Sequence, residues 1–237
     1  MNLIRKGHRQ SHRGVIGVES AIVMIAFVIV AAALAFVVLN MGFSTTQKAK
    51  TAIVSSLGEA SSSMEIAGKV TGYGCTTSAG GCGTTTKLNV TSVPIKVVSG
   101  GDSVNLQNTT ASIKYLSNSY QYDNIYVGPL TGNTYSSVSS AFTGANSELA
   151  TTFTSTIHPI SKAEPSTTKA IIYWTVRSNS NAILDQGEHA VIAIAHGANE
   201  RPVALDKVRI EVVIPSGAPL TVERNIPNIT TSVVDLG

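Results

Sequence analysis

The sequence predicts an α+β protein, in which a long hydrophobic N-terminal α-helix is followed by an antiparallel β-sandwich head domain. Two observations lead to this prediction. Residues 21–39 form an uninterrupted apolar run, and seven short segments rich in β-branched and aromatic residues follow residue 86. Hydrophobic residues make up 43% of the 237-residue chain and charged residues only 13%. This composition argues against a disordered, solvating protein.

The basic residues are concentrated at the N-terminus, where residues 1–14 hold four of them and no acidic residue. The formal net charge of +3 therefore becomes −1 for residues 15–237, which keep 13 basic and all 14 acidic residues. The basic balance of the whole chain consequently gives no support to a nucleic-acid partner. It fits the rule that cytoplasmic flanks of membrane helices are positively charged.

The apolar run AIVMIAFVIVAAALAFVVL covers residues 21–39, close to the roughly 20 residues that a membrane-spanning helix needs. Apolar residues occupy every face of this predicted helix, so its surroundings must be apolar on all sides. A bilayer or a bundle of identical helices meets that requirement. An ordinary secretory signal fits poorly, because its apolar core is shorter and precedes a small-residue cleavage site. A plain single-pass anchor is the simpler alternative.

The helix is expected to continue to about Ala67 and to end near Gly68. Beyond Leu39 its pattern becomes amphipathic. The sparse apolar stripe consists of Ile53, Val54, Leu57, Met64 and Ile66.

Residues 13–50, from Arg13, Gly14, Val15 and Glu19 to the stretch VLNMGFSTTQKAK, resemble the archaeal flagellins, or archaellins, of the type IV pilin-like superfamily. The resemblance implies a class III leader that a membrane leader peptidase removes after Gly14, which leaves Val15 as the new N-terminus. Three parts are then expected: a leader (residues 1–14), an N-terminal helix (15–68) and a head (69–237).

The same resemblance implies a structural subunit that waits in the membrane and then polymerises non-covalently into the extracellular filament of the archaellum. The partners would be identical subunits, the leader peptidase, and an archaellum assembly and motor complex that drives swimming. Glu19 is expected to pair with the N-terminal amine of a neighbouring subunit, as in pilins, or to complement the dipole of its own helix. The other assembly residues expected in the filament core are Ile22, Ile25, Phe27, Ile29, Leu34, Phe36 and Leu39.

Seven segments predict the strands of the head, and their number and turn signals favour an antiparallel, immunoglobulin-like sandwich. Residues 132–168 are ambiguous between a short helix and a Ser/Thr-rich insertion. Residues 72–87, GYGCTTSAGGCGTTTK, are expected to form a loop. The segments are KLNVTSVPIKVVS, TASIKYLS, NIYVGPL, KAIIYWTVRS, HAVIAIAH, DKVRIEVVIP and PLTVERN.

Five polar or sulfur-containing residues are candidates for covalent modification. Cys75 and Cys82 are expected to form a short-range disulfide that stiffens the loop, with free thiols as the alternative. Their number and spacing do not fit a zinc or redox motif. Asn89, Asn108 and Asn228 each begin an N-x-[ST] sequon and are candidates for N-glycosylation.

No catalytic constellation, cofactor motif or metal-ligand pattern is recognisable in the sequence. His158, His189 and His196 are scattered over different segments, and Asp185 to Glu188 is interpreted as a hairpin turn more readily than as a cation loop. The alternatives to an archaellin are an adhesive archaeal type IV pilin and a membrane-anchored binding module. An enzyme is a more remote alternative.

Overall fold

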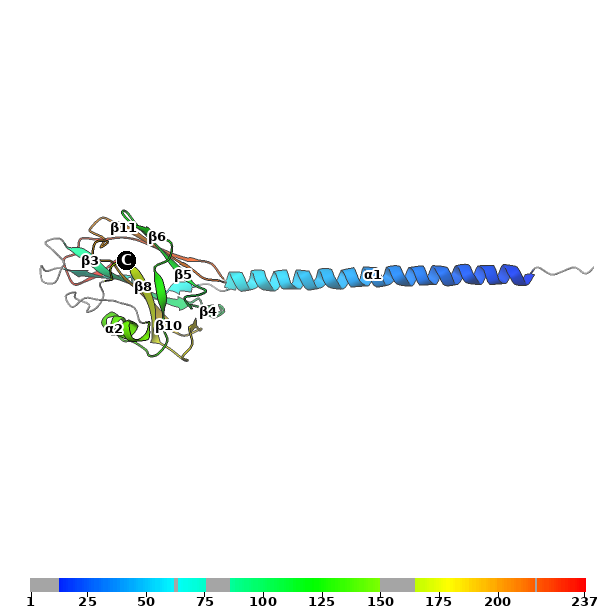
Figure 1. Ribbon diagram of the computed structural model, residues 1–237, viewed down its shortest axis with the longest axis horizontal. Helices are drawn as coiled ribbons and strands as arrows, with labels where there is room; N and C mark the ends of the chain where they lie inside the picture. Colours follow the sequence, from blue (N-terminus) through cyan, green and yellow to red (C-terminus); the bar gives the residue numbers. More distant parts are fainter. Residues whose placement is uncertain (1–12, 62–63, 76–85, 150–164, 216) are drawn as a thin grey trace, which may run out of the picture. The chain divides into compact units, whose positions relative to one another are not determined.

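The computed structural model describes residues 13–61, 64–75, 86–149, 165–215 and 217–237 (Figure 1). The chain divides into two compact units, residues 1–55 and residues 56–237. The first contains most of helix α1 (Arg13–Ser61), whose 49 residues give a length of about 74 Å. The second is the head.

Helix α1 ends earlier than the sequence pattern predicts. It stops at Ser61, and Met64 and Ile66 lie in strand β1 (Met64–Ile66), which pairs with strand β3 (Lys87–Val97). Two apolar residues at alternate positions fit one face of a strand as well as a sparse helical stripe. Pairing with β3 decides between them, because it places Met64 in the core of the head with 6% exposure. The prediction of helix up to Ala67 was therefore wrong.

The head contains two larger sheets and one small one. The larger sheet has the order β13-β2-β3-β10-β8-β7, with β1 also paired to β3, and the second has the order β12-β11-β5-β6. All seven predicted strand segments are confirmed as β3, β5, β7, β8, β10, β11 and β12. The remaining bounds are β2 (Thr71–Cys75), β4 (Val104–Asn105), β5 (Ser112–Ser117), β6 (Gln121–Tyr122), β7 (Tyr126–Leu130), β8 (Lys169–Val176), β9 (Ile183–Leu184), β10 (His189–Ala195), β11 (Lys207–Val213), β12 (Leu220–Asn225) and β13 (Val233–Asp235).

One strand pair departs from the predicted antiparallel arrangement. Strand β7 pairs with β8 in parallel, whereas the other strand pairs of the described residues are antiparallel. A parallel pair needs a crossover connection instead of a tight turn. The chain between these two strands includes helix α2 (Val138–Glu148), so the helical alternative for residues 132–168 is confirmed for that part. Residues 150–164 lie outside the described residues.

Two apolar clusters hold the head together in three layers. The first lies between the two larger sheets and includes Ile95 and Ile192 from one sheet with Ile113 and Ile210 from the other. The second lies on the opposite face of the larger sheet, where Phe142 and its neighbours on α2 pack against β8 and β10. The head is therefore a sandwich with helix α2 on the outer side of the larger sheet (Figure 1).

Residues 72–75 were predicted as part of a loop, but they belong to strand β2, so that part of the prediction was wrong. The glycines of β2 permit close approach of core side chains, because a Cβ on Gly72 would lie 2.6 Å from Leu88 Cδ1 and one on Gly74 would lie 2.1 Å from Ile229 Cγ2. Strand β13 pairs with the other edge of β2, and Leu236 packs into the core beside it. Glycine, which usually weakens a strand, is required here by packing.

Replacing Gly74 by alanine should destabilise the head, because Ile229 cannot withdraw without opening the core. We expect a loss of about 1–3 kcal/mol, which lowers the melting temperature by about 2–4 °C per kcal/mol. The fluorescence of Trp174, the single tryptophan of the chain, reports the unfolding because its side chain is fully buried in the head. Gly68→Ala is the matched control, since its nearest contact would be an ordinary 3.5 Å to Pro94 Cγ. Equal melting of both variants would contradict the packing account.

Candidate assembly surface

The apolar half of α1 exposes its side chains on every face of the helix. Ile22, Val23, Met24 and Ile25 cover one complete turn and are 61%, 67%, 74% and 61% exposed. No polar side exists from which water could solvate this segment, so the helix requires apolar surroundings in all directions. Each large side chain of this kind contributes about 1.5–3 kcal/mol when it is fully buried.

The residues predicted for the filament core all belong to this surface. They are 60–77% exposed in the single chain, and helical geometry places five of them on one side of the helix and Phe27 and Leu34 on the opposite side. The set consists of Ile22, Ile25, Phe27, Ile29, Leu34, Phe36 and Leu39. One helix of the described residues, Gly17–Leu57, is long and apolar enough to cross a membrane.

The character of α1 changes after Asn40. Ser44, Gln47, Lys48, Thr51 and Ser55 follow one another at helical spacing and line a shallow hollow on one face. The hydroxyl of Thr51 donates to the carbonyl of Gln47 at 2.9 Å, so it is satisfied within the helix. This part of the helix can therefore meet water or a polar neighbour on one side, unlike the part that precedes it.

The residues predicted for leader processing lie at the start of α1. Arg13, Gly14 and Val15 belong to its first turn, and Glu19 is exposed one helical turn beyond Val15. Residues four apart share one helix face. An amine created at Val15 would thus lie on the same side of the helix as the Glu19 carboxylate. The roles of these four residues in processing and assembly stay predictions.

The buried histidine of the head is a structural residue. His196 lies between the sheets, where Nε2 is 2.9 Å from Thr91 Oγ1 and Nδ1 is 3.3 Å from the hydroxyl of Tyr115. Its side chain has no exposed surface. Burial, aided by the positive charge of Arg201, lowers the pKa of His196 to about 3, so the ring is neutral at ordinary pH. No substrate can reach it in the folded head.

The sequence did not predict that a second polar side chain, that of Glu188, is buried in the head. Glu188 ends the predicted turn at residues 185–188, but its carboxylate turns inward and accepts hydrogen bonds from Trp174 Nε1, Ser178 N and Asp185 N at 3.2, 2.7 and 3.2 Å. These bonds fix the turn. The guanidinium of Arg177 lies 4.9 Å from the centroid of the Trp174 ring. The turn is confirmed, since Glu188 N donates to the Asp185 carbonyl at 3.1 Å, but it is not a hairpin, because β9 pairs with β4 and β10 pairs with β3 and β8. Within the described residues, no group of three or more His, Cys, Asp or Glu side chains could hold a metal ion.

The three sequons differ in how deeply their asparagines are buried. Asn89 is fully buried in β3, and Thr91 of the same sequon contacts His196. Asn108 and Asn228 are exposed outside the strands. The Asn108 side chain uses one amide N–H to contact the Val127 carbonyl at 3.1 Å, which leaves the second available. Asn89 is therefore a poor glycosylation candidate, and the other two stay predictions.

The predicted disulfide is only partly covered by the described residues. Cys75 is the last residue of β2 and is 3% exposed, so it lies in the head and not in an exposed loop as predicted. Cys82 lies outside the described residues. The Cys75–Cys82 bridge therefore stays a prediction.

Comparison with known proteins gives concordant matches over nearly the whole chain. The model of the family "archaeal-type flagellin" matches residues 14–224. Probable flagellin 1 of Aeropyrum pernix is 34% identical over 218 residues, which cover 91% of this chain and 92% of that relative. Among solved structures, the archaeal flagellum of Methanospirillum hungatei matches with a TM-score of 0.56 and 21% identity, over 92% of this chain and 98% of its own. Archaeal flagellin FlaB1 from Methanocaldococcus jannaschii matches with a TM-score of 0.52 and 18% identity, over 74% and 96% of the two chains. The structural matches show a shared fold.

The sequons provide a test of the burial pattern. Mass spectrometry of peptides from the mature protein should find glycans on Asn108, Asn228 or both, and an unmodified Asn89. An oligosaccharide on Asn89 would have to displace β3 from the core, so its detection at high occupancy would contradict the fold described here.

The stability of the head should depend on pH through His196. Its pKa is about 6.5 in the unfolded chain and about 3 in the head, so only the unfolded state takes up the proton between these values. The contribution of His196 is complete above pH 6.5 and declines by about 1.4 kcal/mol per pH unit toward pH 3.

Melting of the detergent-solubilised chain, followed by Trp174 fluorescence between pH 7 and pH 4, measures this dependence. His196→Gln should flatten the curve relative to the unchanged chain. An equal slope for the unchanged chain and His196→Gln would refute the assignment.

Proposed function

Because the chain belongs to the archaeal-type flagellin family and is a filament subunit, we propose that helix α1 forms the filament core after removal of a 14-residue leader. One observation carries this proposal: the apolar surface of α1 is exposed on all sides between Val18 and Leu39. Identical helices in a bundle can cover every face of it. A single partner on one side cannot.

Before assembly, the membrane supplies the apolar surroundings. The backbone of α1 is satisfied by its own helical hydrogen bonds, as a membrane span requires. The small residues Ala31, Ala32, Ala33 and Ala35 then permit close helix approach in the filament. Transfer from lipid to bundle exchanges one apolar environment for another, so the same surface serves both states.

Cleavage after Gly14 prepares the helix for assembly. The family match begins at Gly14, which supports a boundary at that residue. Removal of residues 1–14 takes away four positive charges and creates an amine at Val15. A buried Glu19 carboxylate is costly without a partner, and the amine of Val15 in a neighbouring subunit supplies one. This pairing would fix the axial position of each incoming subunit.

The assembled product is an extracellular surface filament. Repetition of one heterologous contact gives an open helical polymer, with the polar heads around the helical core. We assign the rotation that drives swimming to a separate motor complex, as membership of the archaeal-type flagellin family implies. Family membership favours the archaellum over an adhesive pilus. Loss of swimming with surface attachment retained in a deletion strain would test this choice.

Protein sheared from the cell surface should begin at Val15 when its N-terminus is sequenced. Glu19→Ala should reduce the filament yield at least about tenfold, because a buried ion pair that loses one partner costs about 3–5 kcal/mol. The precursor should accumulate in the membrane fraction.

Glu65→Ala is the matched control. It removes an ion pair with Lys96 at 3.0 Å in which both side chains are partly exposed, so the yield should stay close to that of the unchanged chain. Sheared filaments that begin at Met1 would refute the leader, and a normal yield with Glu19→Ala would refute the pairing.

A further inference from the structure

Leu205 combines two unfavourable features that the folded head does not explain. Its side chain is 89% exposed, and its backbone has a φ of +72°. It is the one non-glycine residue of the described chain with positive φ. A β-turn position of this kind usually holds glycine or asparagine, because a Cβ clashes with the backbone there. A leucine at this place therefore strains the backbone and gains no burial within the single chain.

The turn that carries Leu205 is held rigidly. Asp206 N donates to the carbonyl of Val203 at 3.1 Å and closes the turn, while Leu205 N donates to the carbonyl of Ile226 at 2.8 Å. The Asp206 carboxylate accepts from Val203 N at 2.9 Å and from Asn118 Nδ2 at 3.0 Å. The leucine is thus presented in one fixed position.

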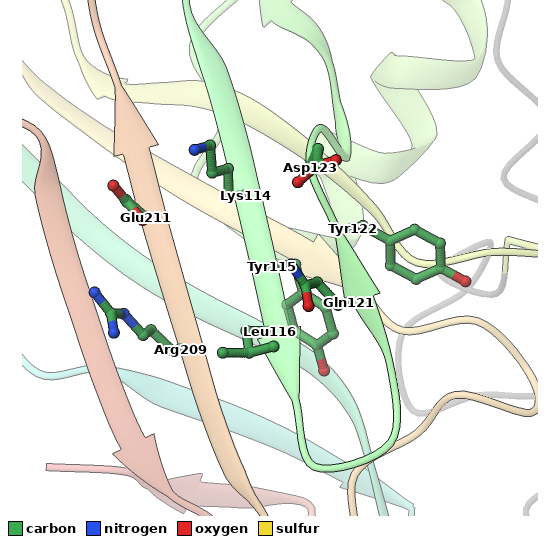
Figure 2. A pocket seen from close by; sticks show the side chains of 8 residues that line it. All are labelled: Lys114, Tyr115, Leu116, Gln121, Tyr122, Asp123, Arg209 and Glu211. Carbon is green, nitrogen blue, oxygen red and sulfur yellow. The ribbon is translucent and has the colours of Figure 1, made fainter.

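The open face of the four-stranded sheet provides a matching surface on the same chain. Leu116 on β5 is 42% exposed, and two hollows of about 240 and 290 Å³ share Leu116 and Arg209 in their lining. Figure 2 shows Leu116 beside Arg209, with Lys114 and Glu211 farther along the same strands. Each hollow is large enough for a leucine side chain.

The charges on this face neutralise one another. Glu211 lies opposite Lys114 across the strands, and Glu223 lies opposite Arg209. Lys207 Nζ is 2.5 Å from Glu223 Oε1. The long basic side chains can bury their aliphatic stems while their charged groups stay hydrated. The face can therefore receive an apolar side chain without leaving an unpaired charge.

We propose that Leu205 of one subunit packs against the Leu116 face of a second copy of this chain in the filament. The inference rests on the role of the chain as a filament subunit, because only there is a second copy held in place. In a filament this contact repeats from one subunit to the next as a heterologous contact, whereas a reciprocal two-fold contact between the same residues would stop at a dimer. The heterologous contact would connect the heads independently of the helical core.

A double variant with Leu205→Cys and Leu116→Cys tests the contact directly. Filaments sheared from cells that produce it should, after mild oxidation, give a ladder of dimers, trimers and longer chains on a non-reducing denaturing gel. The unchanged chain, with Cys75 and Cys82 only, and each single variant should give no ladder. Dimers from Leu205→Cys alone would indicate a two-fold contact and overturn the proposal.

Accessibility of the same position gives a second measurement. A maleimide probe should label the Leu205→Cys chain at least tenfold more slowly in filaments than in detergent-solubilised subunits. Equal labelling rates would overturn the proposal while leaving the filament role intact. Absence of filaments from the unchanged chain would instead overturn the filament role.

Leu205→Gly keeps the test independent of cysteine chemistry. Glycine relieves the positive-φ strain, so the head of the solubilised subunit should melt higher by about 2–4 °C. The filament should nevertheless dissociate at a lower temperature than the unchanged filament. Filaments that are as stable as the unchanged ones, or more stable, would show that Leu205 makes no contact between subunits.

Discussion

The apolar surface of α1 is the constraint on which the rest of this protein depends. A helix with large side chains such as Phe27 and Phe36 exposed in the single chain has no stable state alone in water. Under the proposed function, a membrane supplies apolar surroundings before assembly and a bundle of identical helices supplies them afterwards. The polar residues that begin at Ser44 mark the end of the segment that needs apolar surroundings on every side. After it the helix has one polar side that can face solvent, while Ile53, Val54 and Leu57 are still exposed. The chain forms a core of its own only in the head, from β1 onward.

The head is stable on its own partly because most of its buried polar groups have hydrogen-bond partners. Glu188 and Glu200 each accept several hydrogen bonds, and Glu200 binds both the backbone and the hydroxyl of Thr168 at 2.7 Å. Asn89 is an exception among the described residues, because neither of its side-chain polar atoms has a hydrogen-bond partner. Its backbone carbonyl still accepts from His196 N at 2.9 Å. The contact of 2.9 Å between Thr91 Oγ1 and His196 Nε2 adds a buried polar link between β3 and the residue that follows β10.

Features that depend on local pattern could be predicted from the sequence, and features that depend on distant contacts could not. Strand β11 was recognisable because Val208, Ile210 and Val212 alternate with polar residues, and those three are buried. Strand β2 was not, since Gly72 and Gly74 have the composition of a loop and only Leu88 and Ile229 explain them. For the same reason the parallel direction of β7 and β8 was not predictable. The exposed apolar residues of α1 could be recognised from the sequence, and their role in assembly stays a prediction, whereas the strained turn at Leu205 has no sequence signal.

The pairing of β3 would have a mechanical consequence in the filament if it rotates as proposed. Strands β1 and β2 are the first two strands after α1, and both pair with β3. Strand β10 pairs with β3 as well. Torque that passes along a helical core would enter each head through β1 and β2 and would be shared at once with β3 and then β10. Load distributed over several ladders reaches no single hydrogen bond in full, so β1 and β2 would resist being peeled from the head.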